Sequence, residues 1–189
     1  MTQGKPNIYI FLGLPGSGKT YFACNLAKRL DVVRLNSDAM RLAIFGSRVK
    51  TTEIYQKGDR KILNSYVFNA IDYATEELLA KGQSVIQDAN HNERSNRKRL
   101  EVLAAQYNGQ VVLIHVKTPR DVAVRRAQER TETKDQRRHT LAEIEDTYTR
   151  MQANTDQPEK SEFVIEIDRL ANFEDQFKAF RTQLEQINE

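Results

Sequence analysis

The sequence predicts an α/β protein in which a five-stranded parallel sheet is covered by helices on both faces. Five short β-like runs recur along the 189 residues, and helical patterns separate them. Strands that alternate with helices pair in parallel, because each crossover helix returns the chain to the same end of the sheet. The expected strands are residues 7–12, 32–36, 84–88, 110–116 and 163–167.

The longest helical pattern lies between the second and third strands and covers about 22 residues, with Gly82 as its C-terminal stop. Its apolar positions, spaced by three and four, are Leu63, Tyr66, Val67, Ala70, Ile71, Ala74 and Leu78. Further helices are expected over 97–107, 119–130 and 172–187, and Thr118 is the expected N-cap of the second of these. No repeat or linker interrupts the pattern, so we predict a single domain over residues 1–189.

The composition is that of a soluble globular protein, with 39% hydrophobic and 29% charged residues. No apolar run approaches the roughly 20 residues that a membrane helix needs. We expect the N-terminal residues to lead directly into the first strand and to contain no secretory leader. We therefore expect a cytoplasmic protein with no membrane partner.

Charge is unevenly distributed. Residues 91–138 contain twelve Lys and Arg against six Asp and Glu, whereas residues 143–189 contain five against twelve. A basic half of this kind can attract polyphosphate or nucleic acid, or it can consist of solvated helix faces. Within it, residues 131–140 are almost entirely polar, which predicts a mobile loop between two helices.

A phosphate-binding motif lies between the first strand and the helix that follows it. The motif G-x-x-x-x-G-K-[ST] is formed by Gly13, Leu14, Pro15, Gly16, Ser17, Gly18, Lys19 and Thr20. Its glycines let backbone N–H groups surround an anion, at the N-terminus of a helix. The Lys19 ammonium can bridge the β- and γ-phosphates, and the Thr20 hydroxyl can bind Mg²⁺. The motif predicts a three-layer P-loop NTPase that binds ATP and Mg²⁺.

Asp38 and Arg41 follow the second strand. Ser37 is the expected N-cap, which puts Asp38 in the first helical turn and Arg41 on the same face. Ligands of parallel sheets bind beyond the C-terminal ends of the strands, so both side chains should face the crevice. There Asp38 can accept the proton of an acceptor hydroxyl, and Arg41 can bind an anionic group of the acceptor. The alternative is a capped helix with a local ion pair.

The third strand ends at Asp88, an arrangement typical of a carboxylate that holds Mg²⁺ through its water shell. Asn90 and Asn92 follow within four residues. We expect Asp88, Asn90 and Asn92 to contact the substrate, and Thr20 and Asp88 to form the metal site. Each asparagine can instead serve only to form a turn.

Arginines are concentrated after the fourth strand. Arg125, Arg126 and Arg130 lie on the expected helix, and Arg137 and Arg138 lie in the polar loop. Arg126 and Arg130 share a face at a spacing of four. They predict a basic helical lid over about residues 119–140 that contacts ATP, with Arg126 catalytic because a lid arginine can neutralise charge in the transition state. The alternative is a solvated basic helix.

Taken together, these motifs resemble the kinase domain of polynucleotide 5′-hydroxyl kinases, within the wider zeta-toxin-like group of small P-loop kinases. The matching segments are Gly13–Thr20, Asp38-x-x-Arg41, Asp88-Ala89-Asn90-x-Asn92 and Arg126-x-x-x-Arg130. The resemblance covers nearly the whole chain in the right order. It implies that Asp38 is the general base, that Arg41 contacts the 3′-phosphate of the acceptor and that Arg126 stabilises the transferring phosphoryl group. The chain departs from the family in having D-A-N in place of D-T-N.

The first functional hypothesis is therefore an ATP- and Mg²⁺-dependent kinase of nucleic-acid 5′-hydroxyl ends, as used in repair. The same frame also serves kinases of small hydroxyl metabolites, such as sugars or nucleoside-like molecules. A third hypothesis is a non-catalytic nucleotide-binding switch, but no D-x-x-G follows the third strand and no N-K-x-D is present. The natural acceptor and the oligomeric state are not predicted.

Overall fold

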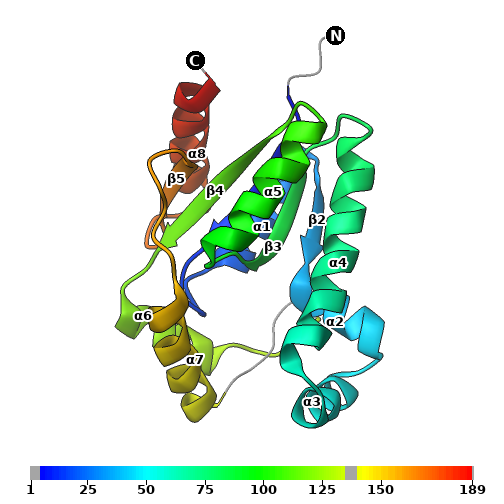
Figure 1. The fold of residues 1–189 in the computed structure, drawn as a ribbon. Coiled ribbons are helices and arrows are strands. Elements are labelled where there is room, and N and C mark those ends of the chain that lie inside the picture. Colours follow the sequence, from blue (N-terminus) through cyan, green and yellow to red (C-terminus); the bar gives the residue numbers. More distant parts are fainter. Residues whose placement is uncertain (1–4, 135–139, 189) are drawn as a thin grey trace.

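The computed structural model describes residues 5–134 and 140–188, apart from the side chains of residues 152 and 188. Its strands form one parallel sheet in the order β2-β3-β1-β4-β5 (Figure 1). The strands are β1 (Asn7–Leu12), β2 (Val33–Asn36), β3 (Val85–Asn90), β4 (Gln110–Lys117) and β5 (Phe163–Asp168). The prediction of a five-stranded parallel sheet is confirmed.

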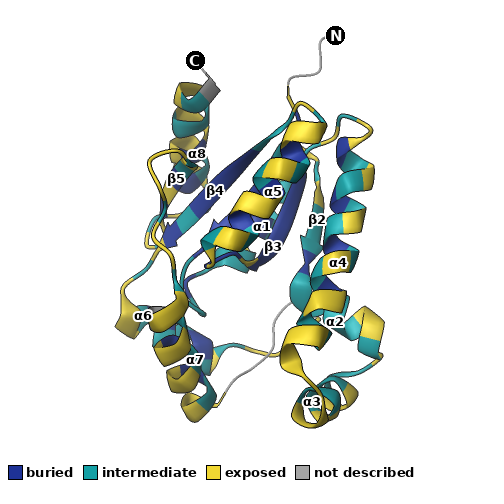
Figure 2. Ribbon diagram, in the orientation of Figure 1, coloured by how far each residue is buried: buried dark blue, intermediate teal, exposed yellow. Residues whose placement is uncertain are grey.

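Helices cover both faces of the sheet. On one face, α1 (Lys19–Leu30) and α8 (Phe173–Asn188) bury Phe22, Leu26 and Phe180 against the strands. On the other, α4 (Arg60–Leu79) and α5 (Arg94–Gln106) bury Leu79 and Leu100. Figure 2 shows the central strands β1, β3 and β4 as the mostly buried centre of this three-layer arrangement. Burial of apolar area in both layers holds the sheet rigid and fixes the positions of its strand ends.

Four helices gather beyond the carboxyl ends of the strands (Figure 1). They are α2 (Ser37–Phe45), α3 (Arg48–Lys57), α6 (Arg120–Glu129) and α7 (Leu141–Asn154). The α7 helix begins with a capping box, in which Thr140 and Glu143 bond to each other's backbone N–H groups. No helix among the described residues is long and apolar enough to cross a membrane.

Three local expectations are wrong. Tyr66 is exposed, because the buried row of α4 follows a strict spacing of four: Val67, Ile71, Thr75 and Leu79. Asn36, not Ser37, caps α2 by accepting a hydrogen bond from the Ala39 N–H at 2.8 Å. Thr118 does not cap α6, because its hydroxyl instead donates to the Ser17 carbonyl at 2.9 Å.

The polar stretch expected to form a mobile loop cannot be compared in full. Residues 131–134 lie outside any helix, and Thr140 is the N-cap of α7. Arg137 and Arg138 fall within 135–139, outside the described residues.

Candidate functional site

Residues 13–18 form a tight loop before α1, and Lys19 and Thr20 are the first residues of that helix. The Lys19 ammonium donates to the carbonyl oxygens of Gly13 and Leu14, at 2.6 and 2.8 Å. Gly18 has a φ of 98°, a backbone conformation that only glycine adopts readily. Gly16 lies so close to α6 that a Cβ there would stand 2.1 Å from the Ala123 carbonyl oxygen. Both glycines are therefore required by the geometry, which leaves the N-terminus of α1 open to an anion.

The ammonium group of Lys19 is buried, and burial changes its pKa. Burial lowers the pKa of Lys19 to about 8, because leaving water penalises the charged ammonium. The charge of Asp88 raises that pKa and the charge of Arg130 lowers it. A phosphate group bound beside Lys19 would favour the charged form again.

Asp88 and Thr20 meet at the end of β3. The Thr20 hydroxyl donates to one oxygen of the Asp88 carboxylate at 3.2 Å. The other oxygen accepts from Arg34 at 2.6 Å and from Asn36 at 2.7 Å. Burial raises the pKa of Asp88, and these hydrogen bonds act in the opposite direction. Asp88 is thus anchored on one side and faces Thr20 on the other.

The Thr20–Asp88 pair fits Mg²⁺. Both groups are oxygen donors, and Mg²⁺ is commonly held by one or two carboxylates together with phosphate oxygens and water. Within residues 5–134 and 140–188 there is no cluster of three His, Cys, Asp or Glu side chains able to hold a metal ion. The residue set therefore suits a cation that arrives with a phosphate ligand, as Mg²⁺ does.

A cavity of about 570 Å³ lies over the loop. We call it the phosphate-loop cavity. Its charged lining comprises Lys19, Asp38, Arg41, Asp88, Arg126, Arg130 and Arg169. Five of these side chains are cationic and two are anionic, and each carboxylate already has an arginine partner. The cavity therefore has an excess of positive charge that suits a polyphosphate.

Asp38 and Arg41 lie on α2 at one wall of this cavity. Their side chains form an ion pair at 3.0 Å. Arg41 also donates to the Tyr55 hydroxyl at 3.3 Å and to the Asn64 side-chain oxygen at 3.2 Å. Because Tyr55 lies on α3 and Asn64 on α4, Arg41 connects α2 to both helices and orients the Asp38 carboxylate.

A second pocket of about 340 Å³ opens on the other side of Asp38. We call it the α3–α4 pocket. Its lining consists of Asp38, Arg41, Leu42, Arg48, Thr51, Thr52, Tyr55, Gln56, Arg60, Asn64, Glu143, Asp146, Thr147 and Arg150. Asp38, Arg41 and Thr147 line both this pocket and the phosphate-loop cavity. The two spaces therefore adjoin at the Asp38 carboxylate.

The α6 arginines enter the cavity selectively. Arg126 and Arg130 line it, whereas Arg125 is exposed. The Nη1 atom of Arg126 is buried and has no hydrogen-bond partner within residues 5–134 and 140–188. Burial lowers the pKa of Arg130, while the charges of Asp38 and Tyr148 raise it. Arg126 thus reaches the cavity from α6, and Arg130 reaches it from the residue that follows the last turn of α6.

The helices α6 and α7 are attached to the phosphate loop itself. The Tyr148 hydroxyl on α7 donates to the Pro15 carbonyl at 2.7 Å. The guanidinium of Arg120, at the start of α6, lies 5.6 Å from the centre of the Tyr148 ring. Ala123 of α6 packs directly on Gly16. Both α6 and α7 are therefore attached to the loop by contacts with its backbone.

Not every residue expected at the site reaches it. Asn90 lines the phosphate-loop cavity, but the Asn92 side chain donates to Thr155 at 2.9 Å and lines a separate pocket behind the loop. Gly13 and Leu14 also face that rear pocket, and Ser17 is buried. The structure thus brings together Asp38, Arg41, Asp88 and Asn90, but not Asn92.

Three residues of the site were missed by the sequence analysis. Arg34 and Asn36 hold Asp88, and Arg169 lines the phosphate-loop cavity from the segment after β5. Asn36 lies opposite Asp88 in the β2–β3 register. An alignment of the two strands in the sequence could therefore have indicated their contact. Arg169 had no local signal, because its neighbour Gly18 is far away in the sequence.

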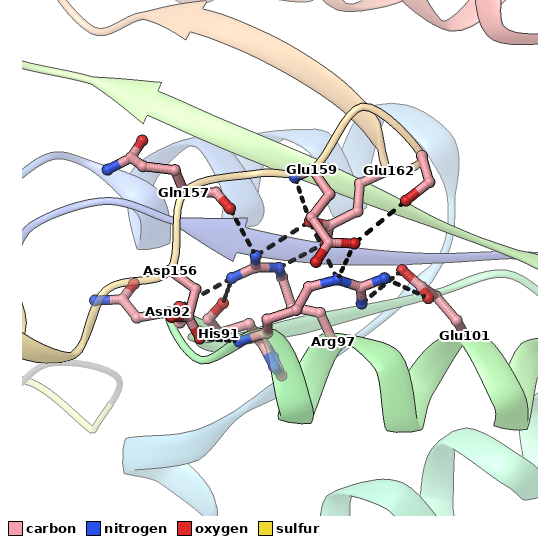
Figure 3. A network of polar contacts seen from close by, with 10 residues as sticks. His91, Asn92, Arg97, Glu101, Asp156, Gln157, Glu159 and Glu162 are labelled. Atoms are coloured by element: carbon pink, nitrogen blue, oxygen red, sulfur yellow. Dashed lines mark hydrogen bonds and ion pairs between the residues drawn. The ribbon is translucent and has the colours of Figure 1, made fainter.

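A network of ion pairs supports the corner between β3 and α5 (Figure 3). Arg97 is fully buried; it forms hydrogen bonds to Glu162 at 2.7 and 3.1 Å and to the His91 and Asn92 carbonyls at 3.1 and 2.9 Å. Arg94 lies 3.1 Å from carboxylate oxygens of Glu101 and Glu159. We call these five residues the corner network: Arg94, Arg97, Glu101, Glu159 and Glu162. The network fixes the segment that follows Asp88.

Comparison with known proteins places the chain in a family. A family model described as an AAA domain, AAA_33, matches residues 8–158. The chain belongs to this AAA domain family. Similar solved structures include a sugar kinase from Janibacter sp. HTCC2649, which is 17% identical over 96% of this chain and 95% of that one, with a TM-score of 0.66. A gluconokinase from Sinorhizobium meliloti 1021 is 14% identical over 97% and 94% of the two chains, with a TM-score of 0.68.

A third structure, a candidate kinase from Chloroflexus aurantiacus j-10-fl, is 20% identical over 96% of this chain and 97% of that one, with a TM-score of 0.68. At these identities the likeness concerns the fold. This AAA domain chain has the α/β fold of small P-loop kinases, as the sequence predicted.

Proposed function

We propose that this AAA domain protein is an ATP- and Mg²⁺-dependent kinase that phosphorylates a hydroxyl group of a small acceptor, such as a sugar or a nucleoside-like molecule. The proposal rests on one observation, the lining of both the phosphate-loop cavity and the α3–α4 pocket by Asp38. A nucleotide in the first space and an acceptor in the second would place their reacting groups at this carboxylate.

Asp38 would act as the general base. As the acceptor oxygen bonds to the γ-phosphorus, Asp38 takes the hydroxyl proton, the bond from the γ-phosphorus to the β–γ bridging oxygen breaks, and ADP leaves. The ion pair with Arg41 keeps the carboxylate directed toward the junction of the two spaces. Because Arg41 is itself fixed by Tyr55 and Asn64, little reorganisation is needed.

The cationic side chains would stabilise the transferring phosphoryl group. Lys19, Arg126 and Arg130 surround the position above the loop where β- and γ-phosphate oxygens bind in P-loop proteins. Thr20 and Asp88 would hold Mg²⁺, which neutralises charge on the β- and γ-oxygens when bound. Hydrogen bonds from Arg34 and Asn36 would hold the Asp88 carboxylate in the orientation that this metal site needs.

The size and chemistry of the α3–α4 pocket support a small polar acceptor. Its volume of about 340 Å³ lies in the range of small-molecule sites, about 300–1,000 Å³. Hydroxyl, amide and charged side chains dominate its lining, which suits a molecule with several hydroxyl groups. Two proteins of similar structure are named as a sugar kinase and a gluconokinase, which agrees with this choice.

A polynucleotide 5′-hydroxyl remains the second candidate, favoured by the position of Arg41, which could contact a phosphate next to the acceptor hydroxyl. The basic stretch at residues 91–138 gives it less support than its composition suggests. Arg94, Arg97 and Lys117 form ion pairs with Glu159, Glu162 and Glu166, from the acidic half of the chain. These three cations are therefore compensated within the protein.

The experiment that tests the proposal is a transfer assay with γ-labelled ATP and Mg²⁺. The acceptors are a panel of sugars, sugar acids, nucleosides and 5′-hydroxyl oligonucleotides. We expect label on a small hydroxyl compound. Label on oligonucleotides alone would favour the second candidate. Tight ATP binding with no labelled product from any member of the panel would favour the nucleotide-binding switch instead.

A further inference from the structure

Arg169 lies beside the phosphate loop although it follows β5. A Cβ atom built on Gly18 would stand 2.3 Å from the Arg169 Nε and 2.4 Å from its Cδ. The guanidinium carbon lies 4.3 Å from the centre of the Tyr21 ring, within the range of a cation–π contact. The backbone N–H of Arg169 donates to the Lys117 carbonyl at 3.2 Å, which anchors its main chain to the end of β4. The side chain is thus held against the loop from outside it.

The guanidinium of Arg169 has no anionic partner in the described part of the chain. Its Nε atom is buried without a hydrogen bond, and the Nη1 atom of Arg126 is in the same condition. Burial lowers the pKa of Arg169, and the positive charge of Arg126 lowers it further. A buried donor without an acceptor costs about 1–3 kcal/mol, and more when it is charged. Two neighbouring guanidinium groups in this condition point to an anion that completes the site.

The acids of the cavity do not fill that role. Asp88 is bound to Arg34, Asn36 and Thr20, and Asp38 is paired with Arg41. Both Arg126 and Arg169 line the phosphate-loop cavity, so an anion that enters it can reach them. A purely structural role for Arg169 would explain its contact with Tyr21, but it leaves the Nε donor unexplained.

The position along the loop indicates which part of the anion is met. In a phosphate loop the glycine-rich backbone surrounds the α- and β-phosphates, while the lysine reaches the β- and γ-phosphates. Arg169 contacts Gly18 and Tyr21, which flank Lys19 and Thr20. The Lys19 ammonium itself turns toward the carbonyls of Gly13 and Leu14. Arg169 therefore stands nearer to the α/β end of a bound triphosphate than to its γ end.

We propose that Arg169, held by the Tyr21 ring, is a further donor-site residue whose guanidinium donates to α- or β-phosphate oxygens of the nucleotide. The inference rests on the proposed function insofar as it requires a nucleotide in the phosphate-loop cavity. It adds a contact from the segment after β5 to those of the loop and of α6. Its role is binding and orientation of the donor, before any transfer occurs.

The test compares Arg169→Gln with Arg125→Gln, which removes the same charge from an exposed position on α6. Calorimetric titrations with ATP, ADP and adenosine in the presence of Mg²⁺ give the dissociation constants. We expect Arg169→Gln to weaken ATP and ADP by the same factor, about ten- to a hundred-fold, as for loss of a charged hydrogen bond. Adenosine binding should change less than two-fold, and Arg125→Gln should leave all three ligands within two-fold of the wild type.

Other outcomes separate the two proposals. If the wild type binds no nucleotide, the proposed function fails. If the wild type binds ATP but Arg169→Gln binds it equally well, the contact proposed for Arg169 is absent. A loss confined to ATP would indicate a γ-phosphate contact, and an equal loss for adenosine a base contact; either overturns the assignment.

A measurement without nucleotide distinguishes a binding role from a structural one. Because Arg169 and Arg126 repel each other and neither has a carboxylate partner among the described residues, Arg169→Gln should unfold at the same temperature as the wild type or higher. A variant that unfolds at a clearly lower temperature would show that the side chain serves the fold, and the proposal would be withdrawn. Arg169→Lys keeps the charge but not the Nε donor, and we expect it to recover nucleotide binding only in part.

Discussion

Two groups of arginines in this chain differ in how completely their charges are compensated. In the corner network, Arg97 is fully buried and bonded to a carboxylate and to backbone carbonyls. In the phosphate-loop cavity, Arg126 and Arg169 are half-buried, and neither forms an ion pair with a carboxylate among the described residues, whereas Arg94 and Arg97 both do. Both groups follow strand ends, so strand position alone does not separate them. The difference lies in what the surrounding chain provides.

This difference distinguishes arginines that stabilise the fold from arginines whose charge is available to a ligand. Glu162 belongs to the segment between α7 and β5, and its contact with Arg97 closes that segment onto the end of β3. Burial alone would raise the pKa of Glu162, but hydrogen bonds from Arg97 and the Glu159 backbone leave it lowered. A guanidinium that is already paired with a carboxylate, as Arg97 is, gains little stability from an added anion. Arg126 and Arg169 would gain stability from a bound anion, because each has a buried nitrogen without an acceptor among the described residues.

The largest effect is expected from Arg126→Ala. If Arg126 neutralises charge on the transferring phosphoryl group, its loss should slow turnover by about 10³- to 10⁵-fold, and ATP affinity should fall much less. Steady-state kinetics, combined with nucleotide titrations, measure both quantities. Equal losses in the two would reduce Arg126 to a ground-state contact and weaken the contrast with the corner network.

Asp38→Ala tests the junction of the two spaces. We expect nucleotide binding to be nearly unchanged and phosphoryl transfer to fall by about 10²- to 10⁴-fold, because the acceptor loses its general base. The measurement is single-turnover transfer at saturating ATP. Glu185→Ala is the control, since Glu185 lines neither space and forms an exposed ion pair with Arg181. Unchanged turnover in Asp38→Ala would remove this residue from the mechanism.

Arg97→Met should act on stability. Removing one member of a buried ion pair leaves the other uncompensated, at a cost of about 3–5 kcal/mol in the free energy of unfolding. Urea unfolding monitored by circular dichroism measures this quantity. Arg181→Gln is the matched control, because it breaks an exposed pair with Glu185 that is worth about 0–1 kcal/mol. Similar losses in the two variants would contradict a structural role for the corner network.

Nucleotide binding should weaken at alkaline pH. The pKa of Lys19 is lowered to about 8, so the free protein loses this charge as the pH rises through that value. Above it, the dissociation constant for Mg²⁺-ATP should rise by up to about tenfold per pH unit. Titrations between pH 7 and 9.5 measure the slope. A flat profile for the wild type would show that Lys19 keeps its proton throughout.

The smallest effect concerns His91, which is buried beside the corner network. Burial lowers its pKa to about 3, and the charge of Arg97 contributes. Below the ordinary histidine pKa near 6.5, His91 is protonated in the unfolded chain but stays neutral in the folded protein. The free energy of unfolding therefore keeps its full value above that pH and decreases as the pH falls. The loss is at most about 1.4 kcal/mol per pH unit.

Urea unfolding at pH 7 and at pH 5 checks the His91 prediction. Both pH values lie above the ordinary pKa of a glutamate such as Glu162, so that residue stays ionised in both states. The wild type should lose more stability than His91→Gln over this interval. Parallel losses in the two proteins would show that His91 takes up its proton in the folded state as well.

Most of the fold was predictable because its signals are local. The five strands are short apolar runs, and the loop at residues 13–20 carries a motif whose glycines the backbone geometry demands. The cap of α2 was assigned to Ser37 instead of Asn36, since both residue types cap helices and a sequence does not show which N–H they meet. Tyr66 was expected on the buried face of α4 because spacings of three and of four residues both fit a helical pattern, but the residues actually buried are spaced by four.

The candidate site was predictable where it follows strand ends. Asp38, Arg41, Asp88 and Asn90 line one cavity because the carboxyl ends of parallel strands share one edge of the sheet. Asn92 follows the same strand, but the chain turns there and its side chain bonds to Thr155.

The sequence by itself determined the parallel sheet, the phosphate loop and the carboxylates after the second and third strands, because each depends on residues close together in the chain. Only the tertiary structure decided that Arg97 is compensated by Glu162 and that Arg169 lies against Gly18 with no carboxylate partner in the described part of the chain. Both contacts join residues far apart in the sequence. Whether a guanidinium stabilises the fold or remains available to an anion depends on the groups that folding brings to it, and no local pattern contains that information.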